Sequence, residues 1–228
     1  MLIIFDLDDT LIDTSGSLTP HKMENSLKAM MKEGLAIKNF NHDLEDLLAI
    51  NAEAESSHTA LENFLLSKNF PLTFLDIGLA ALREELMPDD PISLVPYVKE
   101  MLEEIKGRHL MAIVSVGFPA LQASKLKKAG IDPSLFSKID IIAEKNKKPS
   151  YQALIDDAQL SCKEVIVCGD RGAIDLAPAQ ELGCHTVHLK RGRGAHVREK
   201  SFSSKAEFAI EDWKGFTKLL EQFETGHP

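Results

Sequence analysis

Short runs of apolar residues, each followed by a helix-like pattern, are the feature that most constrains the fold of this chain. Runs of strand length stand at 2–5, 110–114, 139–143, 165–168 and 186–189, with a last short one at 208–210. Most of their residues are apolar without alternation, which is typical of strands buried on both faces in a parallel sheet. Gly130 and Gly183 end two of the helix-like segments between them. The repeated units therefore predict a parallel sheet with helices on both faces.

Residues 20–87 interrupt this alternation with helical periodicity alone. Apolar residues fall on one helical face in four successive groups: Met23, Leu27, Met30 and Met31; Leu44, Leu47 and Leu48; Leu61, Phe64 and Leu65; and Leu75, Leu79, Leu82 and Leu86. A breaker-rich stretch, Met87-Pro88-Asp89-Asp90-Pro91, follows them. The first predicted strand precedes this block and the others follow it. We therefore predict a Rossmann-like α/β core over 1–14 and 91–228, with an all-α helical cap domain inserted at 15–90.

Composition and charge limit the function classes. The chain has 228 residues, with 26 Lys and Arg against 35 Asp and Glu, for a formal net charge of −9. This balance argues against a nucleic-acid partner, although a local site for a small phosphorylated substrate can oppose the global charge. No apolar run approaches the roughly 18 residues of a membrane span, and the first residues lack a signal-peptide pattern. Three cysteines without metal-ligand spacing, Cys162, Cys168 and Cys184, favour a reducing, cytoplasmic setting. Oligomeric state stays open.

The residues that follow the predicted strands carry the chemistry, because open α/β sheets bind ligands at the carboxyl ends of their strands. In chain order these residues are Asp6, Asp8 and Asp9; Ser115; Lys145, Lys147 and Lys148; and Asp170 and Asp175. Clustered carboxylates repel one another, and Mg²⁺ relieves that repulsion because it prefers oxygen ligands and commonly binds with substrate phosphate. A lysine and a hydroxyl can hold the remaining phosphate oxygens. An aspartate can also attack phosphorus to form an aspartyl-phosphate.

These strand ends resemble the four motifs of the haloacid dehalogenase (HAD) superfamily of phosphohydrolases. The four segments, in family order, are Ile4-Phe5-Asp6-Leu7-Asp8-Asp9-Thr10-Leu11, Val114-Ser115, Lys148-Pro149 and Gly169-Asp170-Arg171-Gly172-Ala173-Ile174-Asp175. The likeness spans residues 1–13 and 92–210, and four motifs in order are far more specific than one. A helical insertion between the first two motifs is also the commonest cap arrangement of this superfamily.

The resemblance implies a role for each carboxylate. Asp6 would be the nucleophile, and Asp8 the general acid for the leaving group and then the base for water. Mg²⁺ would be held by Asp6, the backbone carbonyl of Asp8, and Asp170. Asp175 would support the metal's water ligands or the lysine.

The resemblance also implies two groups that bind the phosphoryl moiety. Ser115 would donate a hydrogen bond to it, and Lys148 would neutralise its charge. Lys145 and Lys147 compete for the lysine role, and Pro149, which opens the next predicted helix, favours Lys148.

Two departures from the family pattern and one basic segment remain. Val116 stands where a polar amide is frequent, and Arg171 where a small polar residue is usual. Arg171 could pair with Asp9, a cap carboxylate or an anionic substrate. Residues 190–205 contain six Lys and Arg against one acidic residue, which predicts a solvated loop or, alternatively, a basic edge that faces substrate or a partner.

We therefore predict a Mg²⁺-dependent phosphohydrolase that cleaves a small phosphorylated metabolite in the cytoplasm, with no nucleic-acid or membrane partner. A phosphotransferase such as a sugar-phosphate mutase would use the same aspartyl-phosphate and stays an open alternative. Asp8 counts against a haloacid dehalogenase. Halide leaves without being protonated, so those enzymes lack the second acidic residue of the first motif. The full set of motif carboxylates counts against a non-catalytic binding protein. The cap carries no signature that names the substrate.

Overall fold

A parallel sheet forms the centre of the α/β core. The computed structural model describes residues 1–192 and 206–224, and within them the sheet has six strands. These are β1 (Leu2–Phe5), β2 (Leu110–Val116), β3 (Lys138–Ile142), β4 (Val165–Gly169), β5 (His185–Leu189) and β6 (Phe208–Ile210). Their order is β3-β2-β1-β4-β5-β6, and every neighbouring pair is parallel. The predicted fold class is confirmed.

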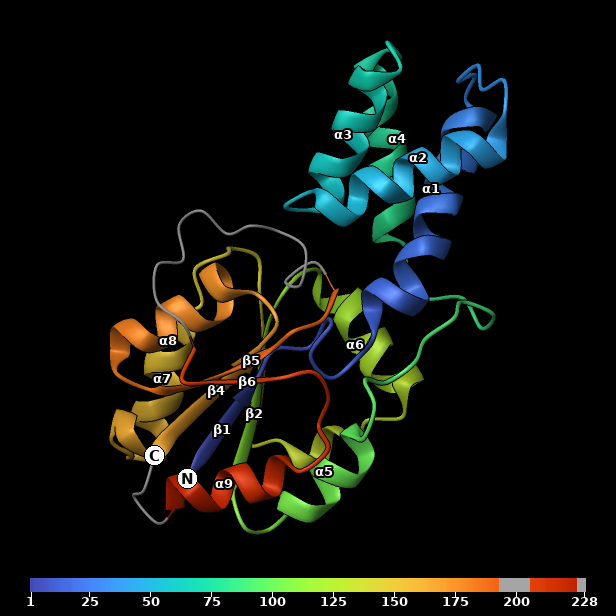
Figure 1. Cartoon of the computed structure of the whole chain (residues 1–228). Helices are drawn as coiled ribbons and strands as arrows, with labels where there is room; N and C mark the ends of the chain where they lie inside the picture. The colour runs from blue at the N-terminus through green and yellow to red at the C-terminus, as the bar shows by residue number, and fades with distance from the viewer. Residues whose placement is uncertain (193–205, 225–228) are drawn as a thin grey trace.

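Helices cover both faces of this sheet because side chains alternate along each strand. Ile3 and Phe5 of β1 belong to an apolar cluster with α5 (Val98–Ile105), α6 (Pro119–Ala129) and α9 (Phe216–Glu224). Leu2 and Ile4 belong to a second cluster with α7 (Lys148–Ala158) and α8 (Ala177–Leu182). Figure 1 shows α7 and α8 on one side of the sheet and α5 and α9 on the other. β1 is therefore buried from both directions at the centre of the core.

The helical block is built from α1 (Thr19–Lys32), α2 (Phe40–Glu53), α3 (Ser57–Ser67) and α4 (Leu75–Arg83). These are the four helices that the apolar spacing predicts. They share an apolar cluster that includes Met23, Leu27, Leu61, Phe64 and Leu79 and contains no residue of the sheet. Figure 1 shows the block beyond one end of the α/β core. The block therefore has a hydrophobic core of its own.

The chain leaves and re-enters the α/β core at neighbouring points. Ile12 forms an antiparallel bridge with Leu94, and the amide of Asp13 donates to the carbonyl of Ser93 over 2.9 Å. The helical block is thus inserted between β1 and β2 through two paired segments. The predicted boundaries at 14/15 and 90/91 lie close to these crossings, and the division into two domains stays a prediction.

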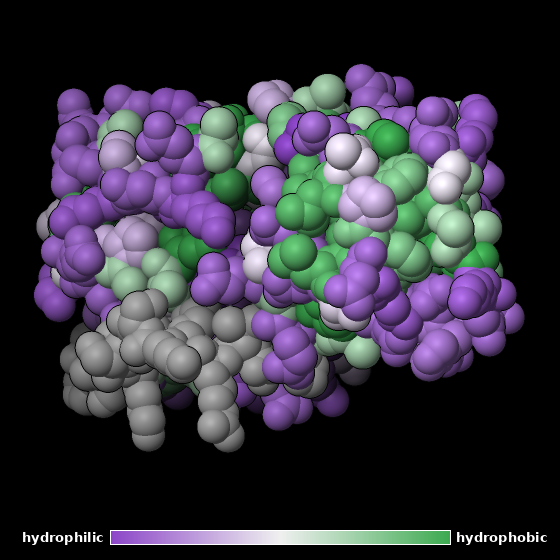
Figure 2. All heavy atoms as spheres, turned by 90° about the horizontal axis from the view of Figure 1, so that it is seen from above, coloured by the Kyte–Doolittle hydropathy of each residue, from purple (hydrophilic) through white to green (hydrophobic). Residues whose placement is uncertain are grey.

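On the face seen from above, the surface differs between the two parts of the molecule (Figure 2). Seen from above, apolar side chains gather on the side of the helical block, whereas polar side chains dominate the side of the α/β core (Figure 2).

Among the described residues, no helix has the length and apolar character needed to cross a bilayer. Most of the predicted basic segment, residues 193–205, lies outside the described residues.

Candidate active site

Three strand ends meet at one edge of the sheet because β1 lies between β2 and β4. Phe5, the last residue of β1, is paired with Ile113 of β2 and with Cys168 of β4. The next residue, Asp6, donates its amide hydrogen to the Cys168 carbonyl over 2.9 Å. Side chains that are more than a hundred positions apart in the sequence therefore converge on Asp6.

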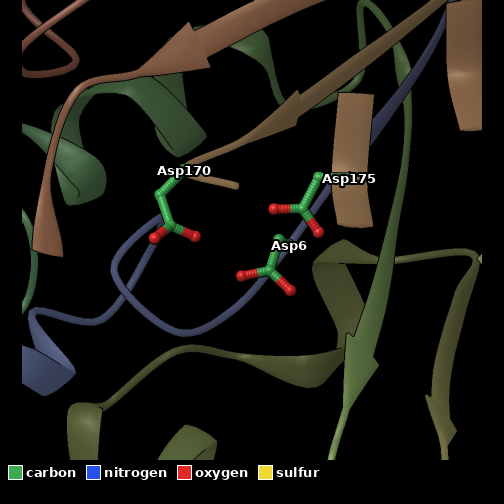
Figure 3. A group of neighbouring side chains, drawn as sticks. All are labelled: Asp6, Asp170 and Asp175. Atoms are coloured by element: carbon green, nitrogen blue, oxygen red, sulfur yellow. The ribbon is translucent and has the colours of Figure 1, made fainter. Parts of the chain in front are cut away.

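Three buried carboxylates converge at this edge. Asp6 follows β1, Asp170 follows β4, and Asp175 lies in the short π-helical turn η5 (Gly172–Leu176). Their side chains point toward one another, and one oxygen of each lies within 4.8 Å of the others (Figure 3). A Cβ at Gly169 would lie 2.4 Å from the Cβ of Asp175, so only glycine lets η5 pack this closely on the strand end.

The charges of this trio fit a hard divalent cation. Burial raises the pKa of Asp6 to about 7, with Lys147 opposing the rise and the charges of Asp175 and Asp8 adding to it. Burial and the neighbouring charges of Asp175 and Asp6 raise the pKa of Asp170 well above its usual value. The Oδ1 atom of Asp170 is buried and has no hydrogen-bond partner in the described part of the chain. An all-oxygen site with an unpaired buried acceptor suits Mg²⁺.

Lys147 is the lysine at the centre of the site. Its Nζ lies 2.6 Å from Oδ1 of Asp6 and 2.6 Å from Oδ1 of Asp175, and it donates to the carbonyl of Val114 over 2.7 Å. Burial alone would lower the pKa of Lys147, but the carboxylates of Asp175 and Asp6 raise it above its usual value. Lys147 therefore stays a cation although its side chain is only 1% exposed.

The choice of Lys148 as the active-site lysine is wrong. Its Nζ pairs with Glu181 Oε2 at 2.8 Å, and its side chain is 42% exposed. Pro149 does lie in the first turn of α7, but the helix already begins at Lys148. The residue just before the helix, Lys147, is the one that reaches the carboxylates.

Asp8 lies apart from the carboxylate trio, in a set of hydrogen-bond donors. It accepts at Oδ1 from Thr14 Oγ1 (2.5 Å) and Lys125 Nζ (2.7 Å), and at Oδ2 from Gln122 Nε2 (2.9 Å). Burial favours a higher pKa for Asp8, but the charge of Lys125 and these hydrogen bonds together hold the pKa below its usual value. Ser115, buried at the end of β2, accepts from the same Gln122 amide over 2.8 Å.

Thr14, Gln122 and Lys125 are not among the site residues predicted from the sequence. A signal for two of them is present, because Gln122 and Lys125 are three residues apart in α6 and so share a helix face. Both are buried, as is the neighbouring Leu126. Polar side chains on the buried face of an amphipathic helix are candidates for a site, since buried polar groups need partners.

Asp9 and Arg171 have partners that differ from those predicted from the sequence. Asp9 has a φ of 57° and accepts from the amide and hydroxyl of Ser15, so it shapes the turn after Asp8. The guanidinium of Arg171 donates from Nη2 to the backbone carbonyl of Glu55 over 2.9 Å. Arg171 therefore links the α/β core to the α2–α3 loop of the helical block instead of pairing with Asp9.

A cavity of about 330 Å³ joins these groups and is bounded by both parts of the molecule. The core contributes Asp6, Asp8, Ser115, Lys147, Asp170 and Asp175, and the block and its approach contribute Leu18, Lys22, Ser57, Leu79, Leu82 and Arg83. This volume is at the low end of the roughly 300–1,000 Å³ of small-molecule sites. The cavity thus suits a small ligand held between a charged floor and a roof that combines leucines with the two cations Lys22 and Arg83.

Comparison with known sequences identifies the family. The sequence profile of the haloacid dehalogenase-like hydrolases matches residues 1–183. The chain belongs to the haloacid dehalogenase-like hydrolases. The resemblance carried by the four motifs is thereby confirmed.

The relatives of this HAD-like hydrolase cover nearly its whole length. The glyceraldehyde 3-phosphate phosphatase of Pyrococcus furiosus is 24% identical over 228 residues, which is 97% of this chain and 93% of that protein. Among solved structures, a putative phosphatase from Clostridium difficile has a TM-score of 0.72 at 18% identity, covering 96% of this chain and 97% of that one. A putative HAD-hydrolase of Bacillus subtilis bound to magnesium has a TM-score of 0.66 at 15% identity, covering 96% of this chain and 97% of that one. The structural matches show the shared fold.

Proposed function

We propose that this HAD-like hydrolase is a Mg²⁺-dependent phosphohydrolase that cleaves a small phosphorylated metabolite through an aspartyl-phosphate on Asp6. The observation that carries the proposal is the meeting of Asp6 with Lys147, Asp170 and Asp175 on the floor of one small cavity. The phosphatase names of the curated relatives support the same reaction.

Asp6 acts as the nucleophile in the first step. One of its oxygens forms a bond to phosphorus while the bond from phosphorus to the leaving oxygen breaks. Lys147 and the Ser115 hydroxyl face the same cavity and stabilise the negative charge on the phosphoryl oxygens. Asp175 holds the ammonium of Lys147 in place through its 2.6 Å ion pair.

Asp8 handles the protons. In its protonated form it gives one to the leaving oxygen, so that an alcohol departs, and the carboxylate this leaves takes one from the water that attacks the aspartyl-phosphate, which restores the protonated form. That attack breaks the bond between phosphorus and the Asp6 oxygen, which releases inorganic phosphate and restores the Asp6 carboxylate.

The metal would be held by Asp6, Asp170 and the backbone carbonyl of Asp8, with Asp175 in support. When bound, Mg²⁺ neutralises the clustered carboxylates and polarises the phosphoryl group. The unpaired buried Oδ1 of Asp170 supports its role as a ligand.

The substrate is proposed to be a short phosphorylated carbonyl compound of the type named by the relatives, glyceraldehyde 3-phosphate. A cavity of about 330 Å³ supports a ligand of that size. We further propose that residues 15–90 act as the cap that selects it. The free state of Cys162, Cys168 and Cys184 supports work in the cytoplasm.

The test is a screen of phosphorylated metabolites with Mg²⁺, with glyceraldehyde 3-phosphate among them and Asp6→Asn as the control. Release of inorganic phosphate by the wild-type chain alone is expected. Transfer of the phosphoryl group to a second sugar hydroxyl, without free phosphate, would instead identify a mutase. Chloride release from 2-chloropropionate would identify a dehalogenase.

A further inference from the structure

Two residues of α6, Gln122 and Lys125, surround the carboxylate of Asp8 and reach it from across the sheet edge. We propose that they are positioning residues, which hold Asp8 in the orientation needed for proton transfer and couple it to Ser115. This inference rests on the proposed function, because it gives Asp8 the acid–base role.

The two carboxylate oxygens of Asp8 accept different numbers of hydrogen bonds. Oδ1 accepts from Thr14 Oγ1 and Lys125 Nζ, whereas Oδ2 accepts, among the described residues, from Gln122 Nε2 only. Each carboxylate oxygen offers about two acceptor positions. Oδ1 is therefore filled, and Oδ2 keeps one position. Since Asp8 also lines the cavity, Oδ2 is the oxygen that exchanges a proton with the leaving group.

Gln122 links Asp8 to the phosphoryl-binding hydroxyl. Its Nε2 donates to Asp8 Oδ2 over 2.9 Å and to Ser115 Oγ over 2.8 Å. A carboxylate facing this amide requires a donor, which fixes the nitrogen on the side of Asp8. The amide oxygen is then buried without a hydrogen-bond partner among the described residues. Leaving that acceptor unpaired has an energetic cost, which indicates that the orientation of the amide serves the site.

The loop after β2 is shaped around this amide. A Cβ at Gly117 would lie 3.0 Å from Gln122 Nε2 and 3.1 Å from its Cδ. Any larger residue at 117 would press on the side chain that holds Asp8.

Lys125 is the second half of the arrangement. It is 6% exposed, and its ion pair with Asp8 at 2.7 Å joins α6 to the turn after β1. A buried ammonium with one carboxylate partner is costly to maintain for stability alone. A role in positioning the reacting carboxylate of Asp8 accounts for the burial of Lys125 beside it.

The test compares two leaving groups in single-turnover experiments with Lys125→Met and with the exposed Lys127→Met as the matched control. General acid–base catalysis contributes about 10²–10⁴-fold, so loss of positioning should slow phosphoryl transfer from glycerol phosphate about tenfold or more. Transfer from p-nitrophenyl phosphate should change far less, because its leaving group needs little protonation. Lys125→Arg should recover much of the loss, and Lys127→Met should match the wild type.

A double-mutant cycle separates positioning from other roles. If Lys125 acts through Asp8, then adding Lys125→Met to Asp8→Asn should cost nothing further. Equal losses for the two substrates, or a full additional loss in the Asp8→Asn background, would overturn the inference and leave the phosphatase proposal standing. If Asp8→Asn itself spares both substrates, the acid–base role fails together with the inference. Should Lys125→Met not fold, Gln122→Met and Gly117→Ala disturb the same carboxylate and are read by the same criteria.

Discussion

The edge of the sheet and the helical block differ in the side chains that they bury: charged groups at the edge and apolar groups in the block. At the edge, charged side chains from distant parts of the sequence are buried against one another, as in the contacts of Lys147 with Asp6 and Asp175. In the block, helices that are consecutive in the chain share one apolar cluster, and the residues they turn to the cavity include Leu79 and Leu82. Burying charge costs stability unless every group is compensated, whereas burying apolar area stabilises. The buried carboxylates and Lys147 therefore gather at the edge, and the block shapes the cavity with apolar residues and with the two cations Lys22 and Arg83.

Replacing the nucleophile should have the largest effect of any single change at the edge. Asp6→Asn keeps the size of the side chain but removes the attacking carboxylate. Loss of a nucleophile that works within a catalytic unit typically costs on the order of 10⁶-fold, so we expect turnover to fall by at least about 10⁴-fold. Steady-state phosphate release measures this loss, and circular dichroism checks that the fold is kept. Near-wild-type turnover would contradict the assignment of the whole edge.

The adjacent residues Lys147 and Lys148 allow the effect of removing a buried lysine to be compared with that of removing an exposed one. Lys147→Met should leave Asp6 and Asp175 uncompensated, and breaking a buried pair in this way costs about 3–5 kcal/mol of unfolding free energy. Removal of its charge from the phosphoryl site should also lower kcat by about 10²–10³-fold. Lys148→Met should change stability by less than about 1 kcal/mol, because exposed ion pairs contribute little. Urea denaturation and kcat are the measurements, and a larger effect at Lys148 would reverse our assignment.

The lysines also show how far the sequence could be interpreted. The run Lys145-Asn146-Lys147-Lys148-Pro149 predicted a lysine at the end of the third strand, and that part was sound. Which lysine points inward depends on the residue at which α7 begins. One residue changes the direction of a helical side chain by about 100°. Pro149 is compatible with more than one helix start, so the choice could not be made from local pattern alone.

The fold and the carboxylates were predictable for a different reason. Strands that are apolar throughout, such as 2–5 and 165–168, permit few arrangements other than a central parallel sheet, which brings Asp6 and Asp170 together. The donors around Asp8 were not predictable in this way. The shared helix face of Gln122 and Lys125 marks them as candidate buried polar residues, but it does not say that they meet Asp8, because that contact depends on how α6 packs across the first strand end.

The raised pKa of Asp6 at the edge should make the free energy of unfolding depend on pH. The pKa of Asp6 is raised from 3.8 to about 7 in the folded protein. Between these values the folded state binds more protons than the unfolded state, so the free energy of unfolding falls as pH rises through about 7. In EDTA we therefore expect Tm to decrease by several degrees from pH 5 to pH 8.

Mg²⁺ should reverse this trend, because it binds the ionised carboxylates and stabilises the folded protein increasingly at higher pH. Asp170→Asn should weaken that stabilisation, and Ca²⁺ should replace Mg²⁺ poorly because it prefers more ligands and looser geometry. Differential scanning fluorimetry at four pH values, with and without metal, gives both curves. An equal rise of Tm with Mg²⁺ at pH 5 and pH 8 would contradict the carboxylate site.

The smallest effect is expected where the two regions touch. Arg171, which lines the cavity, donates to the Glu55 carbonyl of the α2–α3 loop, and the only charge in this hydrogen bond is its own. Partly exposed hydrogen bonds contribute about 0.5–1.5 kcal/mol net, which corresponds to about 2- to 10-fold in an equilibrium constant. Because this contact links a residue of the cavity wall to the α2–α3 loop and does not involve Asp6, Arg171→Gln should raise KM within that range and leave kcat nearly unchanged. Arg171→Lys, which keeps a donor and the charge, should lie between Arg171→Gln and the wild type. A fall in kcat comparable with that of Lys147→Met would place Arg171 in the chemistry, and the separation of a catalytic edge from a shaping block would then no longer hold.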